Sequence, residues 1–448
     1  MIERDYDWYM VREDHVRLEE ITSSWENRCV LERLRDNGED QRYDEEDDEC
    51  FLCILDEGLE DEFTNHFDYK FIIRRGDDLG WLGYFIGNSK DLTVLHMNCS
   101  FPLGFPLIEG ICRNQTIQTL EIANDFGDYT SLISSLLRNN LASLLLKNMT
   151  VTNVHDLAMA FESCPNTLVS LTLLETNNFL ERDVSVLAKA LRSQPNIESL
   201  ELHLYGWGGT DFCAALATSM LKWGENSQLR DLNLHDNNID DEGMQKLVEG
   251  LACCHNLIQL DLSRNQMSAV GLRSLSSLYQ TSSCCVISLT LQSMEIDDEG
   301  VAALVSGLAD YNPLRILDLS RNAIGDEGVA ALVSSLTTAE NDPALDTLDL
   351  SENVFSIAGI RSLSTLLTSE KMKRLENLSI DEFKLCSVGA SVLVEALANN
   401  ALLRPRTGLR QLRVDCTTLS GGDDIFSRVL CDASSINKIY TSNLILSK

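Results

Sequence analysis

The sequence contains no apolar run that is long enough to cross a membrane, because no window approaches about 18 uninterrupted apolar positions. Its first residues, MIERDYDWYMVRED, are charged throughout and lack the apolar core of a secretory signal. We therefore expect a soluble, cytoplasmic protein that does not bind membranes. In that compartment the 14 cysteines are expected to be reduced thiols, packed mostly as small apolar groups.

The sequence also lacks a complete set of residues for metal, nucleotide or acid–base chemistry. Cys50 and Cys53 form the only CxxC, and neither a second CxxC nor a histidine pair completes a zinc site. The phosphate-binding motif GxxxxGK is absent, and the two aspartates of GDDLG at 76–80 would repel phosphate. We expect no catalytic residue, no cofactor and no bound metal, and therefore no enzyme.

Positive charge is scarce. The chain has 36 Lys and Arg against 69 Asp and Glu, a formal net charge of −33. Nucleic acids and anionic membrane surfaces carry phosphates, which such a chain repels, so neither is an expected partner. The charge permits a basic protein partner, although acidity also serves solubility alone.

What the sequence does contain is a repeat. Four units begin at Leu229, Leu257, Val286 and Leu314 and share the same chemistry at fixed offsets. Each has leucines three and five residues on, an apolar residue ten on, a glycine fourteen on and a leucine eighteen on. A recurrence of this fidelity is typical of an array of stacked repeats.

The physical content of one repeat follows from its spacing. LxxLxL predicts a short strand that buries alternate side chains, and the segment after the glycine predicts a helix with one apolar face. Neither element buries its apolar face alone, so neighbouring repeats must stack. Predicted helix N-caps are Asp240, Ser268, Asp297 and Ser356. We also predict that one asparagine per repeat forms hydrogen bonds with backbone groups in the loop after the strand; these residues are Asn237, Asn265, Asn322 and Asn353.

This pattern resembles the leucine-rich repeat family, specifically its ribonuclease-inhibitor-like type with one strand and one helix per repeat. The resemblance implies an α/β fold, a right-handed solenoid or horseshoe with parallel strands on the concave face and helices on the convex face. About 13 units begin at Leu92, Ile117, Leu141, Leu168, Ile197, Leu229, Leu257, Val286, Leu314, Leu345, Leu375, Leu409 and Ile436.

The repeat divides the chain unequally. Residues 1–66 do not follow it and are interpreted as an acidic, largely helical capping region; recruitment of a partner is the alternative for this region. Residues 67–448 are interpreted as the repeat array, with a degenerate opening unit at 67–91, repeats from 92 and an unfinished last repeat at 436–448. That uncapped end predicts possible self-association.

Residues two, four and six positions after the first apolar residue of each strand are expected to face the concave solvent. Here acidic residues predominate, and they are interpreted either as a docking track for a basic protein or as ordinary repeat consensus that serves solubility. His96 is expected on the same face, and Trp223 is a second aromatic candidate for contact. The candidate protein-binding residues are Glu121, Glu201, His203, Tyr205, Asn233, His235, Asp261, Asp318, Asp349, Asp381 and Asp415.

The favoured hypothesis is a non-catalytic scaffold that binds a partner protein through the concave face. The alternative is a regulator of an enzyme, either an inhibitor or a GTPase activator similar to those of Ran. In the Ran activators an acidic segment follows the repeats, whereas here the acidic run at 44–49 precedes them.

Overall fold

The structure is a computed structural model of the chain. It describes residues 22, 25–36, 50–56, 70–73, 79–98, 104–123, 129–148, 154–164, 166–174, 181–204, 208–281, 284–308, 313–339, 342–380, 387–403, 409–414, 438–440 and 445–447. Contacts divide the chain into two compact units, Met1–Tyr205 and Gly206–Lys448, and each unit is described by itself.

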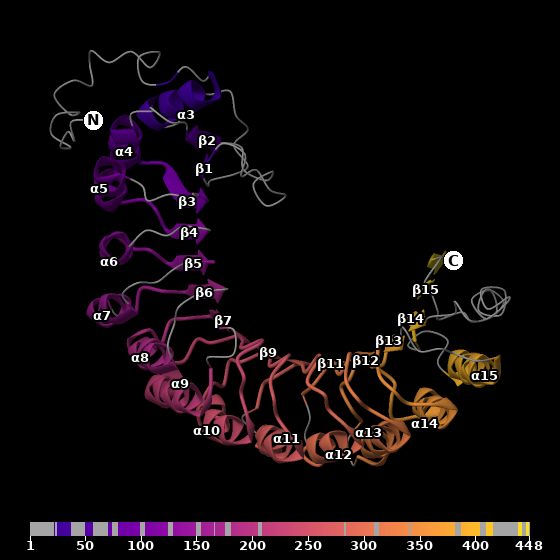
Figure 1. Cartoon of the computed structure of the whole chain (residues 1–448). Coiled ribbons are helices and arrows are strands. Elements are labelled where there is room, and N and C mark those ends of the chain that lie inside the picture. The colour runs from indigo at the N-terminus through magenta and orange to yellow at the C-terminus, as the bar shows by residue number, and fades with distance from the viewer. Residues whose placement is uncertain are drawn as a thin grey trace. The chain divides into compact units, whose positions relative to one another are not determined.

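The first unit alternates strands and helices along the chain. Its strands run parallel in the order β2-β1-β3-β4-β5-β6-β7, and its helices α4 to α8 lie on one side of the sheet (Figure 1). The strands are β1 (Cys50–Asp56), β2 (Lys70–Ile73), β3 (Leu92–Asn98), β4 (Thr119–Ala123), β5 (Ser143–Lys147), β6 (Ser170–Leu174) and β7 (Ser199–His203). The helices are α3 (Trp25–Asp36), α4 (Leu79–Asn88), α5 (Phe105–Arg113), α6 (Thr130–Arg138), α7 (Val154–Ser163) and α8 (Glu181–Ala190).

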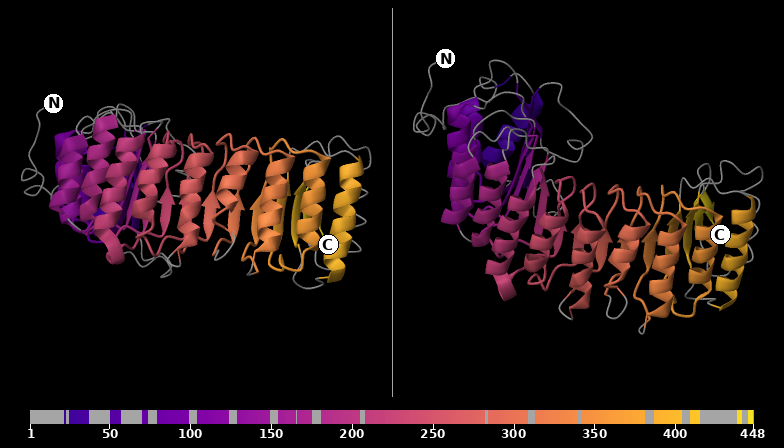
Figure 2. Two further views of the ribbon diagram at one scale, coloured as in Figure 1. Left: turned by 90° about the horizontal axis from the view of Figure 1, so that it is seen from below. Right: turned by 60° about the horizontal axis from the view of Figure 1, so that its bottom comes forward.

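The second unit repeats the same arrangement more regularly, and Figure 2 shows its helices packed side by side over the strands. Strands β8 to β15 are parallel and in chain order, whereas β16 pairs antiparallel with β15. The strands are β8 (Asp231–Asn233), β9 (Gln259–Asp261), β10 (Ser288–Thr290), β11 (Ile316–Asp318), β12 (Thr347–Asp349), β13 (Asn377–Ile380), β14 (Gln411–Val414), β15 (Lys438–Tyr440) and β16 (Ile445–Ser447). The helices are α9 (Thr210–Trp223), α10 (Asp241–Leu251), α11 (Ala269–Ser276), α12 (Asp298–Val305), α13 (Asp326–Thr338), α14 (Ile357–Thr368) and α15 (Ser387–Leu403).

The predicted α/β solenoid of strand–helix repeats is confirmed. In the repeat that begins at Leu314, the strand leucines Leu317 and Leu319 and the helix residues Val329 and Leu332 are all buried. The thiols of Cys164 and Cys254, in loops that lead back to strands, are buried as well, and burial raises the pKa of Cys254 to about 11. In each unit the core thus lies between the strands and the helices, and none of the described helices covers the opposite side of the sheet (Figure 1).

Three of the four predicted asparagines, Asn265, Asn322 and Asn353, join neighbouring repeats through their side chains. The side-chain oxygen of Asn322 accepts hydrogen bonds from the N–H groups of Met294 (2.9 Å) and Ile296 (3.1 Å) in the preceding repeat. Its amide nitrogen donates to the carbonyls of Leu291 (2.8 Å) and Leu319 (2.9 Å). Asn265 and Asn353 make equivalent bonds.

The helix starts are capped as predicted, with an additional contribution from the neighbouring repeat. Asp240, Ser268, Asp297 and Ser356 each accept a hydrogen bond from a backbone N–H of the helix that they precede. Asp326, at the start of α13, also accepts from Ser356 (N–H and hydroxyl) and from the N–H of Gly359 at the start of α14. Burial raises the pKa of Asp326, but these hydrogen bonds outweigh that effect and hold it below the ordinary value.

The amino-terminal end of the first unit departs from the sequence interpretation. No strand was predicted at residues 50–56, yet β1 lies in the sheet between β2 and β3. Helix α3 packs against α4 and the edge strand β2. There the buried amide of Asn27 donates to the carbonyl of Ile72 (2.7 Å) and accepts from its N–H (2.9 Å). These bonds satisfy edge groups of β2, as a cap would; the extent of the capping region stays a prediction.

Within the described part of the chain, no helix is long and apolar enough to span a membrane.

Replacing Asn322 by Ala should destabilise the second unit by about 3 kcal/mol or more, because it leaves several buried backbone groups without a partner. Urea unfolding followed by circular dichroism measures the loss, with S334A, at an exposed position of α13, as the control. Stability of N322A within about 0.5 kcal/mol of the parent protein would contradict the role given to this side chain.

Candidate protein-binding surface

The side of the sheet that faces away from the helices carries the candidate residues. In β11 the central Leu317 is buried, whereas Ile316 and Asp318 on either side of it point to the opposite face and are accessible. The same alternation holds in β8 to β12. We call this side the open face of the sheet.

Most of the candidates in the second unit form one row across the open face. Residues directly opposite one another on successive strands are Asn233, Asp261, Thr290, Asp318, Asp349 and Ser379. All six are partly accessible. Because neighbouring strands lie about 4.8 Å apart, three carboxylates are held within four consecutive strands. We call Asp261, Asp318 and Asp349 the carboxylate row.

Each carboxylate of the row also has a structural role. One oxygen of Asp261, Asp318 and Asp349 accepts a hydrogen bond of 2.8 Å from the N–H of the serine two residues on. Asn233 does the same for the N–H of His235, at 3.0 Å. These local side-chain-to-backbone bonds fix the loop that leaves the strand, so the Asp-x-Ser spacing has a conformational explanation as well as an electrostatic one.

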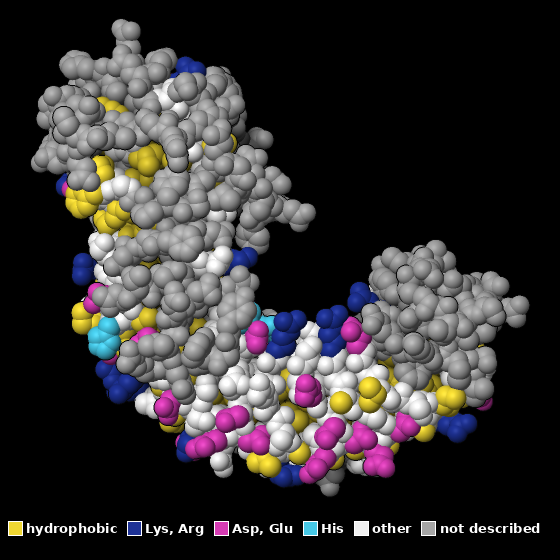
Figure 3. All heavy atoms as spheres, viewed as in Figure 1, with side chains coloured by type: hydrophobic (Ala, Val, Ile, Leu, Met, Phe, Trp, Pro, Cys, Tyr) yellow, Lys and Arg dark blue, Asp and Glu magenta, His cyan; other side chains and the backbone are white. Residues whose placement is uncertain are grey.

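The charges of the row act on one another. Burial raises the pKa of Asp318 above its ordinary value, and the carboxylates of Asp349 and Asp261 raise it further, against hydrogen bonds from Ser320 that lower it. The charge on Asp318 therefore costs the folded protein some stability. The row is not an isolated acidic surface: Arg321 pairs with Glu352 at 2.6 Å, and Figure 3 shows Lys and Arg beside Asp and Glu on this unit.

In the first unit the open face is more varied. Glu121, Leu145, Thr172 and Glu201 lie directly opposite one another on β4 to β7 and are partly accessible. His96 lies on the expected face, opposite Glu121, but it is not accessible as expected: it is 5% exposed, and its Nδ1 lies 2.9 Å from a carboxylate oxygen of Glu121. Its strand neighbours on the same side, Val94 and Asn98, are buried too, so the accessible open face begins beyond β3.

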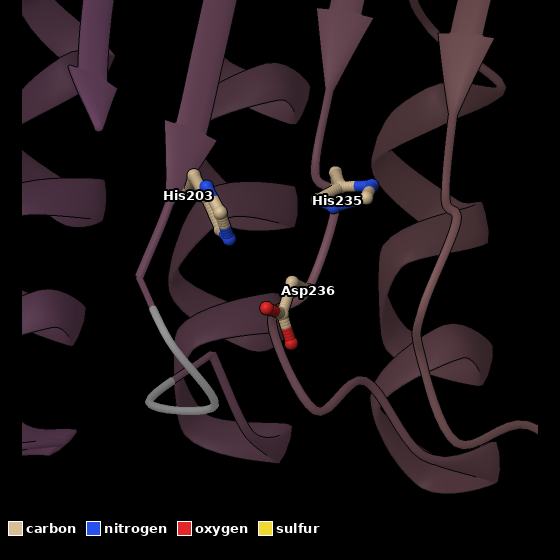
Figure 4. A group of neighbouring side chains, drawn as sticks. All are labelled: His203, His235 and Asp236. Atoms are coloured by element: carbon tan, nitrogen blue, oxygen red, sulfur yellow. The ribbon is translucent and has the colours of Figure 1, made fainter. Parts of the chain in front are cut away.

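The two candidate histidines lie at, or just after, the ends of their strands. His203 is the last residue of β7 in the first unit, whereas His235 and Asp236 follow β8 in the second (Figure 4). Asp236 has a left-handed backbone with φ 56°, and its N–H donates to the carbonyl of Ser263 at 3.0 Å. The histidines are half-buried.

The prediction that Trp223 is a contact residue is wrong, and three of the candidate binding residues fall outside the described residues. Trp223 is 2% exposed, because it lies on the buried face of α9. It is therefore a core residue and no contact candidate. Tyr205, Asp381 and Asp415 lie outside the part of the chain that the structure describes.

The mutation D318N should raise the melting temperature at neutral pH. Asparagine keeps the oxygen that accepts from Ser320 but removes a charge whose pKa is raised in the fold. A carboxyl group whose pKa is raised in the folded state costs stability, in full, at any pH above that raised pKa. The stability gained by D318N should therefore shrink as pH falls through the folded-state pKa and vanish below the unfolded-state pKa. Thermal melts from pH 3 to pH 8 test this; a variant that is less stable at neutral pH would contradict the assigned repulsion.

Comparison with known proteins agrees with the repeat architecture. The family model described as Leucine Rich repeat matches residues 225–248, 253–276 and 312–333. The mouse (Mus musculus) ribonuclease inhibitor is 26% identical over 345 residues, 70% of this chain and 73% of the inhibitor. The pig (Sus scrofa) ribonuclease inhibitor is 26% identical over 321 residues, 65% of this chain and 67% of the inhibitor.

Among solved structures, an internalin from Listeria monocytogenes aligns with 82% of this chain and 97% of its own, at a TM-score of 0.41 and 14% identity. The chain therefore carries leucine-rich repeats, built as strand–helix units, and it is similar in sequence to ribonuclease inhibitors.

Proposed function

We propose that this protein is a non-catalytic scaffold that binds a basic partner protein through the open face of its sheet. The observation that carries the proposal is the carboxylate row. Asp261, Asp318 and Asp349 lie in register on one accessible face, and the charge on Asp318 is held there against burial and like-charge repulsion. A cationic surface docked on this face would relieve that repulsion.

The relatives support a protein as the partner. Two of them are inhibitors of ribonuclease. An extended sheet face without helices over it also suits a macromolecule better than a small molecule, which is normally enclosed in a concave pocket. We also propose that the scaffold acts in the cytoplasm. Nucleic acid is not a proposed partner, because a chain with a net charge of −33 repels its phosphates.

A second candidate function is regulation of an enzyme. The match to ribonuclease inhibitors favours the inhibitor version of this alternative over a GTPase activator. Adding the purified chain to a ribonuclease assay distinguishes the two functions, because a scaffold without regulatory activity leaves the rate unchanged.

Affinity capture tests the scaffold. The tagged chain and the variant D261N/D318N/D349N are used to capture partners from the native cell lysate at low and moderate salt. Asparagine retains the acceptor oxygens that bond Ser263, Ser320 and Ser351, so the variant loses charge and keeps the loop geometry. A basic partner is expected on the parent chain, with about tenfold less on the variant and less at higher salt.

The matched control is E242Q/E299Q/E327Q. These three glutamates are exposed in the first turns of α10, α12 and α13, and their neutralisation changes the net charge by the same amount. The control should keep the partner. If both variants lose the partner equally, net charge alone explains the loss. If both variants still capture the partner, the carboxylate row is not part of the interface.

A further inference from the structure

The open face of the first unit differs in chemistry from the carboxylate row. Across β4 to β7 the central row runs Glu121, Leu145, Thr172, Glu201, each opposite the next. Its two inner positions carry no charge, and its two ends are carboxylates. A half-buried leucine between two glutamates is suited to an apolar group flanked by cations.

The neighbouring row toward the start of the strands is uncharged. Two positions before the central row, the four strands carry hydroxyl residues that are all half-buried. They are Thr119, Ser143, Ser170 and Ser199. Between the two glutamates these two rows therefore offer hydroxyl groups and one apolar group. The row on the other side carries Lys147, two residues after Leu145 and exposed, so the uncharged surface is confined to the central row and the hydroxyl row.

Glu121 is held in place by the adjacent strand. His96, opposite it on β3 and 5% exposed, lies with Nδ1 2.9 Å from Oε2 of Glu121. A carboxylate only accepts, so Nδ1 donates in this bond. The side chain of Glu121 remains 22% exposed, which leaves part of an oriented carboxylate accessible to a partner.

The spacing of the row specifies the partner's conformation. Neighbouring strands lie about 4.8 Å apart, so β4 and β7 are separated by about 14 Å. An extended peptide advances about 3.4 Å per residue and presents alternate side chains on one face, so its residues i and i+4 also stand about 14 Å apart, with i+2 between them.

We propose that the face of β4 to β7 binds an extended segment of the pattern basic–x–apolar–x–basic, laid across the strands. The two cations pair with Glu121 and Glu201, and the apolar side chain packs on Leu145 beside Thr172. This inference rests on the proposed function, since it takes the open face to be protein-binding, and it adds the chemistry of a segment bound by the first unit.

A labelled synthetic peptide tests the proposal on the full chain. The probe Gly-Ser-Lys-Thr-Leu-Thr-Lys-Ser-Gly is compared by fluorescence anisotropy with Gly-Ser-Lys-Lys-Leu-Thr-Thr-Ser-Gly, which has the same composition and the wrong spacing. We expect the first peptide to bind about tenfold more tightly. Equal binding of the two, or no binding of either at millimolar concentration, overturns the proposal.

Variants then locate the peptide. L145S and E121Q/E201Q should each weaken it about tenfold, whereas L145M, which keeps an apolar surface, should bind as the parent chain does. D261N/D318N/D349N should leave peptide binding unchanged. Circular dichroism of each variant excludes unfolding as the cause. If L145S and E121Q/E201Q bind the peptide as tightly as the parent chain, the peptide binds elsewhere and the proposal is overturned. Capture of a lysate partner through the carboxylate row is a separate measurement, so this proposal can fail while the proposed function holds.

Discussion

Each repeat of this array is complete only when its neighbour supplies hydrogen bonds to its backbone. Asn322 reaches back to accept from Met294 and Ile296, and Asp326 reaches forward to the N-terminus of the following helix. The apolar faces of strand and helix require stacking, but apolar contact alone does not fix register. The buried side-chain bonds do, since a shifted repeat would leave them unsatisfied.

This construction leaves one side of the sheet free for other chemistry. Across β8 to β12 the buried side chains of the strands face the helices, so residues on the open face differ from repeat to repeat without disturbing the core. In the second unit those positions carry the carboxylate row, and in the first they carry a leucine and a threonine between two glutamates. The same architecture therefore holds two surfaces of different chemistry.

Local periodicity made the repeats, caps and asparagine bonds predictable, because each depends on residues at fixed offsets. The position of β1 between β2 and β3 was not predictable in this way, since its pairing is non-local and CFLCILD has no repeat around it. Burial of His96 and Trp223 also depends on tertiary packing. Asp261, Asp318 and Asp349 lie on the open face as expected, but their bonds to Ser263, Ser320 and Ser351 were missed, although the Asp-x-Ser spacing was visible.

Zero-length carbodiimide cross-linking of the captured complex, followed by mass spectrometry, tests the central claim most directly, because it joins carboxylates only to lysines in direct contact. If the open face binds a basic protein, partner lysines should be linked to Asp261, Asp318 or Asp349 and not to the exposed glutamates of the helix side, Glu242, Glu299 and Glu327. Links concentrated on the helix-side glutamates, with none on the carboxylate row, would contradict the account.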